Sequence, residues 1–334
     1  MVKIAVAGGS GPVAREIIDV LVSRGEGKHE VVVLSRKAPA DGEALEGTTW
    51  VTVDYEDKSS LVKALQGVDT VLSFIAVHLD PDSSIAKRII DAAVDAGVKR
   101  FAPSEWSAYV DSTTSLSKID LLPWYAGKGV IRQYLADLNK DKKANFPPSP
   151  FVIEYTLFQV GAFADYLATP YQTAKYVEPN MTWWDMEKGR ILAIDPPKET
   201  VTLTTVKDIA NVVALAIEYK GEWPVIGGIH GTTVTSAEVI ALGEKLRGKK
   251  FAVETLSADD LRAGVWKGSW LPILNMPSIT EAERLQFSQF VTGACLLSNL
   301  EASWTASDEW NKLLPDYKFA NLEEFLAEVW TGKP

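Results

Sequence analysis

The sequence predicts an α/β fold built on a doubly wound parallel sheet, with a smaller lobe in the C-terminal part of the chain. In the first 160 residues, short runs of β-forming residues alternate with segments of helical periodicity, which is the pattern of a parallel sheet flanked by helices. The chain also opens on a continuous apolar run, residues 2–7, as expected of a strand that is covered on both faces. After residue 160 this alternation loosens, and most of the 11 tryptophans lie there.

The elements of the first 160 residues follow one another in regular order. Residues 13–22 are predicted as the first helix, because Val13, Ile17, Ile18 and Leu21 fall on one helical face. The same reasoning predicts helices at residues 59–65, 84–96 and 123–138, and strands at residues 30–34, 49–53, 69–75, 99–102 and 151–157.

Beyond residue 160 the predicted elements form a second part of the molecule. We expect strands at residues 191–194 and 200–204, and helices at residues 206–219, 236–247, 258–263, 280–290 and 322–330. These elements insert between and after the strands of the main sheet. We therefore predict one domain of residues 1–160 and a lobe of residues 161–334 that is partly interleaved with the sheet and has no independent core.

The composition narrows the class of protein. The 334 residues carry a formal net charge of −10, which opposes binding to nucleic acid or anionic membranes, whose phosphates attract positive surface. No apolar stretch reaches the ~18–20 residues that a membrane helix needs. The single cysteine, Cys295, suits a reducing compartment, and the three histidines are too far apart for the common zinc patterns. We expect a cytoplasmic protein that holds no metal and binds neither nucleic acid nor membrane.

A glycine-rich loop joins the first predicted strand to the first predicted helix. Residues 8–14, Gly-Gly-Ser-Gly-Pro-Val-Ala, satisfy the pattern G-x-G-x-x-(G/A). Glycines let the backbone turn tightly and approach a pyrophosphate, while the helix N-terminus offers free N–H groups. This context favours a Rossmann-type dinucleotide site over a structural turn. The expected cofactor-binding residues of the loop are Gly8, Ser10, Gly11, Pro12 and Val13.

The residues that follow the second predicted strand indicate which dinucleotide binds. Proteins that bind NAD place an acidic residue there, which holds the ribose 2′-hydroxyl. Here the strand ends in Ser35-Arg36-Lys37, with no acidic residue before Asp41. Arg36 and Lys37 can pair with a 2′-phosphate, and Ser35 can donate a hydrogen bond to it. The pattern favours NADPH, and the alternative is a solvated basic turn.

Three further stretches share the pattern of a known family. They are residues 53–57 with the run 60–73, residues 99–106 (Lys-Arg-Phe-Ala-Pro-Ser-Glu-Trp), and residues 155–157 followed by Gly161, Phe163, Asp165 and Tyr166. Together with the glycine loop, they resemble the isoflavone-reductase-like, or NmrA-like, family of atypical short-chain dehydrogenases. The resemblance covers roughly residues 1–250 and fades across the tryptophan-rich C-terminus.

The resemblance implies an NADPH-dependent reductase with a Rossmann domain and a smaller C-terminal substrate lobe. It places Asp54 at the adenine and Ser104 at the cofactor. It also places the end of the fourth strand along the cofactor towards the nicotinamide, namely Ser73, Phe74, Ile75 and Ala76. Trp106-Ser107 stands where the plant reductases commonly have Phe-Gly, which indicates the microbial, fungal side of the family.

The resemblance further implies a catalytic lysine. Reductases of the family carry it in a helix with the pattern Lys-x-x-(Val/Ile)-Arg-x-x-(Ile/Leu), and residues 128–135 fit, which implies Lys128 at the nicotinamide ribose. Burial and a neighbouring cation lower the pKa of a lysine, which can then act as general acid or base. Tyr125 lies three residues earlier on the same helical face and is the candidate catalytic partner. The alternative is that both are surface residues whose stems cover apolar surface.

Aromatic residues indicate the kind of substrate. Trp106, Phe163 and Tyr166 are expected to line an apolar pocket near the nicotinamide, and His78, just past the fourth strand, can relay a proton there. Each is also of a type that fills ordinary cores or loops. We expect a monomer or homodimer that reduces a carbonyl or conjugated double bond of a small aromatic or polyketide-like metabolite.

Two other functions stay open at this point. The NmrA branch of the family contains dinucleotide sensors without turnover. The same fold also supports isomerases, cyclases or epimerases that leave the cofactor unconsumed. Sensors typically lack the lysine constellation, so Lys128 favours a reductase.

Overall fold

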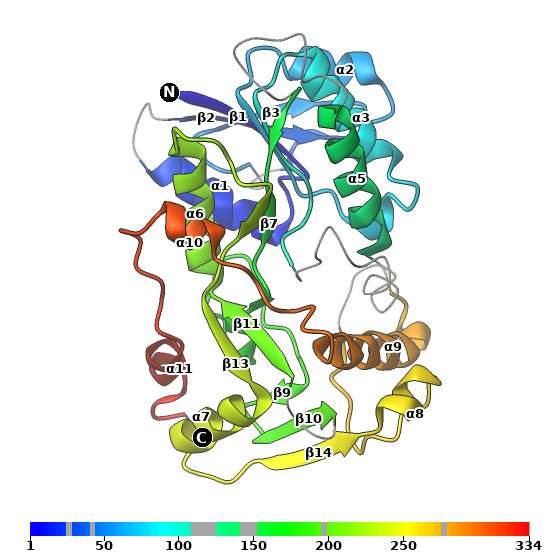
Figure 1. Cartoon of the computed structure of the whole chain (residues 1–334), viewed down its shortest axis with the longest axis vertical. Coiled ribbons are helices and arrows are strands. Elements are labelled where there is room, and N and C mark those ends of the chain that lie inside the picture. The colour runs from blue at the N-terminus through cyan, green and yellow to red at the C-terminus, as the bar shows by residue number, and fades with distance from the viewer. Residues whose placement is uncertain are drawn as a thin grey trace.

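A six-stranded parallel sheet forms one end of the molecule (Figure 1). The structure, a computed structural model, describes residues 1–24, 29–40, 44–107, 125–140, 152–194, 199–274 and 279–333. The strands of this sheet are β1 (Val2–Ala7), β2 (His29–Ser35), β3 (Thr48–Thr52), β4 (Thr70–Ser73), β5 (Arg100–Ala102) and β6 (Glu154–Tyr155). Their order is β3-β2-β1-β4-β5-β6, and every neighbouring pair is parallel. The order reverses between β1 and β4, which confirms the predicted doubly wound sheet.

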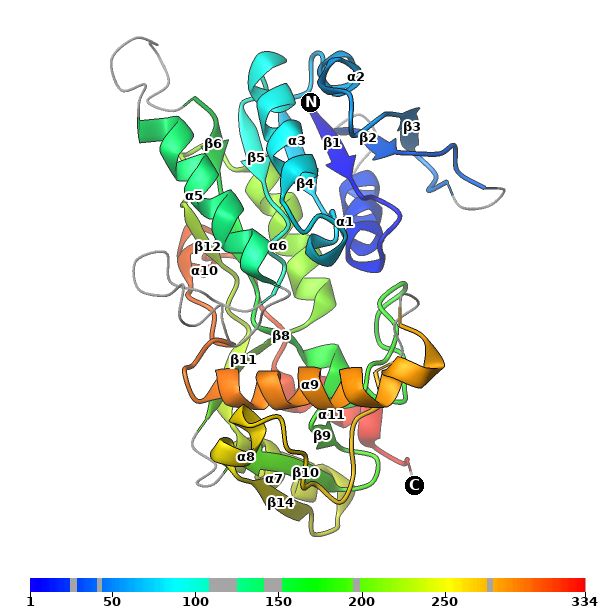
Figure 2. The ribbon, with the colours of Figure 1, turned by 90° about the vertical axis from the view of Figure 1, so that its right-hand side faces the viewer.

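Helices cover both faces of this sheet (Figure 2). On one face lie α1 (Pro12–Ser23) and α6 (Val206–Glu218), and on the other α2 (Lys58–Ala64), α3 (Ser84–Asp95) and α5 (Ala126–Lys140). The side chains of β1 alternate between the two layers. Ile4 and Val6 pack with α1 and α6, whereas Ala5 and Ala7 pack with the opposite layer. Burial on both faces explains why β1 reads as one uninterrupted apolar run.

The strand predicted at residues 151–157 is two short strands, so this prediction was wrong. β6 pairs with β5, whereas β7 (Leu157–Gln159) leaves the main sheet and pairs with β12 (Ile226–Gly228). The N–H of Leu157 donates to the carbonyl of Val225. Both short strands are buried among apolar neighbours, so the hydrophobic pattern did not mark the change of partner. Residue 151 lies outside the described residues.

The helix predicted at residues 280–290 is also longer than expected. α9 spans Glu281–Asn299. All residues from Thr292 to Asn299 are buried, so no polar face alternates with an apolar one there. The periodicity on which the prediction rested therefore ends at Phe290, although the helix continues.

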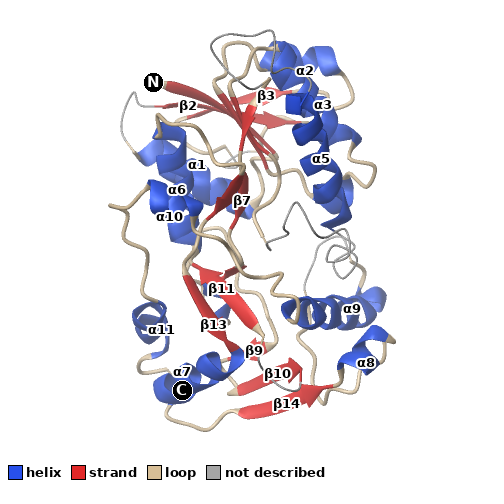
Figure 3. Ribbon diagram, viewed as in Figure 1, coloured by secondary structure: helices blue, strands red, loops and turns tan. Residues whose placement is uncertain are grey.

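The second lobe has a hydrophobic core of its own, which overturns the prediction that it has none. One of its sheets joins β9 (Trp184–Asp185), β10 (Arg190–Ile194) and β14 (Ala252–Leu256), and another joins β8 (Ala162–Phe163), β11 (Thr200–Thr204) and β13 (Thr232–Thr235) (Figure 3). Its helices are α7 (Ser236–Arg247), α8 (Ala258–Arg262), α9 and α11 (Leu322–Trp330). The core between them includes Trp183, Trp184 and Trp330. Aromatic rings bury large areas, so a few tryptophans suffice to build it.

Other parts of the second half pack against the main sheet instead. α6 contacts α1, and α10 (Glu309–Leu313) brings Trp310 against Trp223 and Phe158 in the core beneath the sheet. The chain after residue 160 thus contributes to both cores. The division into domains at residue 160 stays a prediction.

Two further expectations concern features that the described residues lack. None of the helices in the described ranges has the length and apolar character needed to cross a membrane. Within the same ranges, no group of three or more His, Cys, Asp or Glu side chains is arranged to hold a metal ion.

Candidate functional site

The glycine loop lies at the point where the strand order reverses. Gly8 has a φ of +75°, and a Cβ there would lie 2.9 Å from the backbone C and O of Phe74, at the end of β4. A Cβ on Gly9 would lie 2.7 Å from Cγ1 of Val33. The N–H of Gly11 donates to the carbonyl of Gly8 (3.1 Å) and closes the turn. Only glycine lets the loop rest this closely on the sheet.

The N-terminus of α1 opens directly from this loop. Gly11 is the N-cap, and it provides no side-chain hydrogen bond. Pro12 follows at the first helical position, and the first turn contains no acidic residue. The unpaired N–H groups and the positive end of the helix dipole are therefore available to an anion. These features fit a pyrophosphate, with Ser10 exposed and Val13 half-buried beside it.

Arg36 and Lys37 lie exposed beyond the end of β2. The hydroxyl of Tyr55 donates to the carbonyl of Leu34 (3.0 Å) at the end of the same strand. Burial raises the pKa of Tyr55 to about 12, while a hydrogen bond with the Gly8 backbone and the charge of Arg36 oppose this rise. Tyr55 therefore interacts with both Gly8 of the glycine loop and Arg36. Arg36 and Lys37 are exposed charged donors of the kind that bind a phosphate, and their contact with a 2′-phosphate stays a prediction.

Ser35 and Asp54 lie on neighbouring turns of the same corner. The N–H of Val53 donates to the carbonyl of Ser35 (2.9 Å), which brings the ends of β2 and β3 together. Ser35 Oγ accepts from the N–H of Lys37 (3.3 Å), and the exposed Asp54 carboxylate accepts from the N–H of Glu56 (2.8 Å). Their contacts with ribose and adenine stay predictions.

The end of β4 continues past the glycine loop towards a small cavity that Ser73 and Ile75 line. Ser73 is buried, and Phe74, Ile75 and Ala76 are half-buried. The indole Nε1 of Trp106 donates to the carbonyl of Ser73 (2.8 Å). The Trp106 ring stacks on Phe74, with ring centroids 4.3 Å apart, and on Phe158, at 5.2 Å. Trp106 is thus held in the core beneath the sheet, where its backbone adopts a φ of +40°.

Lys128 lies in the first turns of α5 and is buried. Its Nζ donates to the backbone carbonyl of Glu105 (2.5 Å) and lies 3.7 Å from the centroid of the Tyr125 ring. Burial lowers the pKa of Lys128 to about 8; the Glu105 carboxylate opposes this effect, and the Arg132 guanidinium adds to it. An amine with this pKa changes protonation near neutral pH, so it can donate or accept a proton.

A glycine sets the position of this helix. A Cβ on Gly127 would lie 2.8 Å from Val77 Cγ1 and 3.1 Å from Ser83 Oγ. Val77 belongs to the 3₁₀ turn η1 (Val77–Leu79), and Ser83 precedes α3. Because no side chain separates these segments, the start of α5 approaches η1 and the start of α3 closely, and Lys128, the next residue, lines the cavity described below.

Tyr125 connects Lys128 to the second lobe. Its hydroxyl lies 2.7 Å from Ser107 Oγ, and its ring packs against the second lobe's core. Burial raises the pKa of Tyr166 above its usual value, and the electrostatic influence of Tyr125 adds to this rise. Phe163 stands beside Tyr166, with ring centroids 5.4 Å apart. Lys128, Tyr125, Phe163 and Tyr166 therefore meet between the two lobes.

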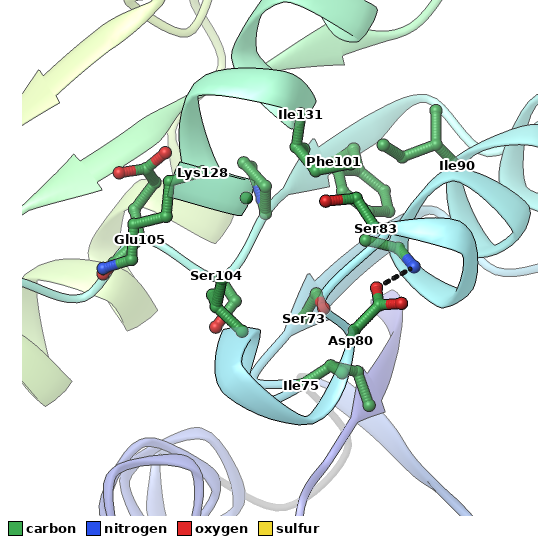
Figure 4. Close-up of a pocket in the computed structure, with 14 residues that line it drawn as sticks. Ser73, Ile75, Asp80, Ser83, Ile90, Phe101, Ser104, Glu105, Lys128 and Ile131 are labelled. Atoms are coloured by element: carbon green, nitrogen blue, oxygen red, sulfur yellow. Dashed lines mark hydrogen bonds between the residues drawn. The ribbon is translucent and has the colours of Figure 1, made fainter. Parts of the chain in front are cut away.

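A small cavity of about 30 Å³ opens beside Lys128 (Figure 4). Four predicted site residues line it: Ser73, Ile75, Ser104 and Lys128. Lys128 and Glu105 lie at one end, and Asp80 and Ser83 at the other. The volume suits one or two water molecules. His78 lies on the exposed side of η1, and neither it nor Trp106 lines this cavity.

Sequence reasoning did not single out Glu105, Arg132 or Ser107. Arg132 pairs with the Glu105 carboxylate through two hydrogen bonds, and both side chains are almost fully buried. The signal was present, since Glu105 belongs to the Pro-Ser-Glu-Trp stretch and Arg132 to the lysine pattern. Ser107 follows that stretch, and only the three-dimensional structure brings it to Tyr125.

The sheet order and the glycine loop at its switch point define a Rossmann-type protein. The chain belongs to the NmrA-like family, whose family model matches residues 2–326. We expected the resemblance to fade after roughly residue 250, but the match continues through most of the second lobe.

Comparisons with individual proteins agree with this family membership. The chain is 28% identical to isoflavone reductase homolog P3 of Arabidopsis thaliana over 97% of both chains. It is 27% identical to oxidoreductase BOA1 of Botryotinia fuckeliana, over 75% of this chain and 78% of that protein. The structure of leucoanthocyanidin reductase with NADPH from Vitis vinifera matches with a TM-score of 0.68 and 16% identity, over 98% of this chain and 99% of that one. At this identity, the structural likeness establishes the fold.

Proposed function

We propose that this protein is an NADPH-dependent reductase that acts on a carbonyl or conjugated double bond of a small aromatic or polyketide-like metabolite. The observation that carries the proposal is Lys128, a buried amine with a pKa of about 8 at the carboxyl edge of the sheet. A sensor needs only to bind the dinucleotide, whereas a buried amine with a lowered pKa that lines a cavity is a candidate for proton transfer. Relatives named as oxidoreductase and isoflavone reductase homolog support a redox function.

The geometry of the glycine loop and its surroundings supports the cofactor site that we propose. Gly8, Ser10, Gly11, Pro12 and Val13 would hold the pyrophosphate at the start of α1. Ser35, Arg36 and Lys37 would hold the 2′-phosphate, and Asp54 would hold the adenosine. The nicotinamide half would lie along the end of β4 and the exit of β5, against Ser73, Phe74, Ile75, Ala76 and Ser104. When bound, NADPH supplies the hydride.

The residues of the cleft have separate tasks in the reduction. Lys128 holds a proton on Nζ and delivers it to the substrate oxygen or carbon that gains charge. Tyr125 supports the amine with its ring and, through its hydroxyl, joins Ser107. Phe163 and Tyr166 form an aromatic wall beside Tyr125, which suits a flat, unsaturated substrate.

The test is hydride transfer. Purified protein is given NADPH deuterated at its transferring carbon together with a panel of aromatic ketones, quinones and enones, and products are examined by mass spectrometry. Incorporation of deuterium, lost in Lys128→Met with NADPH binding retained, is the expected result. Binding of NADPH without deuterium in any product would instead favour a sensor, and product without net NADPH oxidation would favour an isomerase or cyclase.

A further inference from the structure

Two basic side chains of α5 converge on Glu105. Lys128 Nζ donates to the backbone carbonyl of Glu105 (2.5 Å). One helical turn later, Arg132 donates to both carboxylate oxygens of the same residue, with distances of 2.8 Å from Nε and 2.5 Å from Nη2. The side chains of Arg132 and Glu105 are 8% and 1% exposed. Glu105 therefore ties the exit of β5 to two successive turns of α5.

The buried ion pair of Glu105 and Arg132 is not explained well by a gain in stability alone. Removing both charges from water offsets most of their attraction, and packed apolar residues often replace buried ion pairs without loss. A planar guanidinium held by both carboxylate oxygens does, however, fix a geometry. Here it fixes the backbone of Glu105, whose carbonyl contacts Lys128.

We propose that Glu105 and Arg132 are positioning residues that act through Lys128, an inference that rests on the function proposed above. Their ion pair keeps the Glu105 carbonyl within hydrogen-bond distance of Nζ and so holds the amine at one end of the cavity. The pair also sets the electrostatic balance at Nζ, because it places one negative and one positive charge beside the amine. Neither residue itself transfers a proton or a hydride.

The charges around Lys128 act in opposite directions. The Glu105 carboxylate favours the protonated amine, and the Arg132 guanidinium disfavours it. Among the described residues, the other titratable groups on the segments packed around this site include Tyr125, which precedes α5, and Tyr166, which interacts electrostatically with Tyr125. They also include His78 of η1, which is exposed, and Asp80, which accepts hydrogen bonds from the first N–H groups of α3. Removing one member of the ion pair should therefore shift the proton affinity of Lys128 in the direction set by the member that remains.

The experiment measures this proton affinity without any substrate. The ¹³Cε signal of Lys128, in protein labelled with ¹³C-lysine and assigned by its loss in Lys128→Met, is followed by NMR across a pH series and gives the midpoint of its titration. Glu105→Gln leaves the guanidinium without its counter-charge, so the midpoint should fall by about one unit, which raises the neutral fraction at pH 7 about fivefold. Arg132→Gln leaves the carboxylate, so the midpoint should rise. The double variant should return close to the parent value.

Matched controls separate this effect from a general loss of structure. Asp185→Asn breaks another carboxylate–arginine pair, Asp185 with Arg190 (2.8 Å), in the second lobe and should leave the midpoint unchanged. Arg132→Lys keeps the positive charge but cannot form the paired hydrogen bonds of the planar guanidinium. The midpoint for Lys128 should therefore stay unchanged, while kcat for NADPH-dependent reduction of phenanthrenequinone should fall about tenfold. Circular dichroism and thermal unfolding verify that each variant folds.

Two results would overturn the proposal. One is a midpoint that moves in the same direction, or not at all, in both single Gln variants. If these variants do not fold, unchanged kcat and midpoint in both Arg132→Lys and Glu105→Asp would overturn it as well. The proposed function is judged separately, because full turnover in Lys128→Met would refute the lysine mechanism while the titration midpoints still decide the role of Glu105 and Arg132.

Discussion

The Nζ atom of Lys128 lies over the face of the Tyr125 ring, 3.7 Å from its centroid, and donates a hydrogen bond to the backbone carbonyl of Glu105. The Tyr125 hydroxyl lies 2.7 Å from Ser107 Oγ. A ring face attracts a cation and tolerates a neutral amine, so it supports both protonation states of Lys128. The ring and the hydroxyl of Tyr125 thus have separate partners, and substitutions can separate them.

Tyr125→Phe should keep kcat within about threefold of the parent, because the ring under Lys128 remains. Tyr125→Leu should lower kcat about tenfold, since a cation–ring contact is worth about 0.5–2 kcal/mol. Steady-state NADPH oxidation with phenanthrenequinone measures both. If Phe and Leu variants lose activity equally, the hydroxyl is the group that matters, as the sequence pattern had suggested.

The reaction should slow as the pH rises through about 8. Burial chiefly lowers the folded-state pKa of Lys128 to about 8 from the usual lysine value of 10.5, so the proton to be donated is lost above that pH. We expect kcat to fall about tenfold per pH unit there.

The same shift has a consequence for stability. The unfolded chain keeps the Lys128 proton up to a higher pH than the folded chain, so burial of this amine destabilises the fold most below pH 8 and less as the pH rises towards the unfolded value. Lys128→Met should therefore be at least as stable as the parent at pH 7 in thermal unfolding. A clear loss of stability would contradict the assigned pKa.

Arg36→Ala should weaken NADPH binding about 10- to 100-fold, because a charge-assisted hydrogen bond is worth about 1.5–3 kcal/mol. NADH lacks the 2′-phosphate, so its affinity should change little. Titration calorimetry with both cofactors makes the comparison. Arg262→Ala, which removes an exposed arginine of α8, is the control and should bind both as the parent does.

Gly8→Ala should abolish measurable NADPH binding and destabilise the fold. A side chain at φ +75° costs about 1–2 kcal/mol, and its Cβ would meet the Phe74 backbone at 2.9 Å. Gly67→Ala is the matched control, with φ +72° and open space around the added Cβ. Chemical denaturation should show a larger loss for Gly8→Ala, and equal losses would mean that the contact with Phe74 is unimportant.

Trp106→Phe should destabilise the fold by about 1–3 kcal/mol and leave KM nearly unchanged. The substitution keeps the stack on Phe74 and Phe158 but removes the donor to the Ser73 carbonyl, which is then buried without that partner. Denaturation and KM for phenanthrenequinone test this together. An altered KM with full stability would return Trp106 to the substrate-binding role expected from the sequence.

The sequence analysis succeeded where a local pattern has a single structural outcome. β1, with both faces buried, and α1, with one apolar stripe, were found almost residue for residue, and the glycine loop lies between them as predicted. Contacts between residues far apart in the sequence were harder to predict from such local patterns. Nothing in the apolar pattern distinguishes an indole that lines a pocket from one inserted beneath a sheet, as Trp106 is.

The second half of the chain shows the same limit. The buried half of α9 has no polar face, so its periodicity vanishes although the helix persists. The core of the second lobe depends on tryptophans from distant segments, such as Trp183 and Trp330, whose meeting is set by the tertiary fold. In the candidate site, Lys128 was predicted from a family pattern, whereas its contact with the Glu105 carbonyl could be seen only in the three-dimensional structure.

The stack of Phe74, Trp106 and Phe158 also gives the protein an optical property. Indole emission overlaps the absorption band of reduced nicotinamide, and Trp106 hydrogen-bonds to Ser73 at the edge where the proposed nicotinamide site begins. Energy transfer from this one residue should therefore exceed that from tryptophans in the second lobe. The difference in tryptophan fluorescence between the parent and Trp106→Phe would then report cofactor occupancy directly, in real time and without a label.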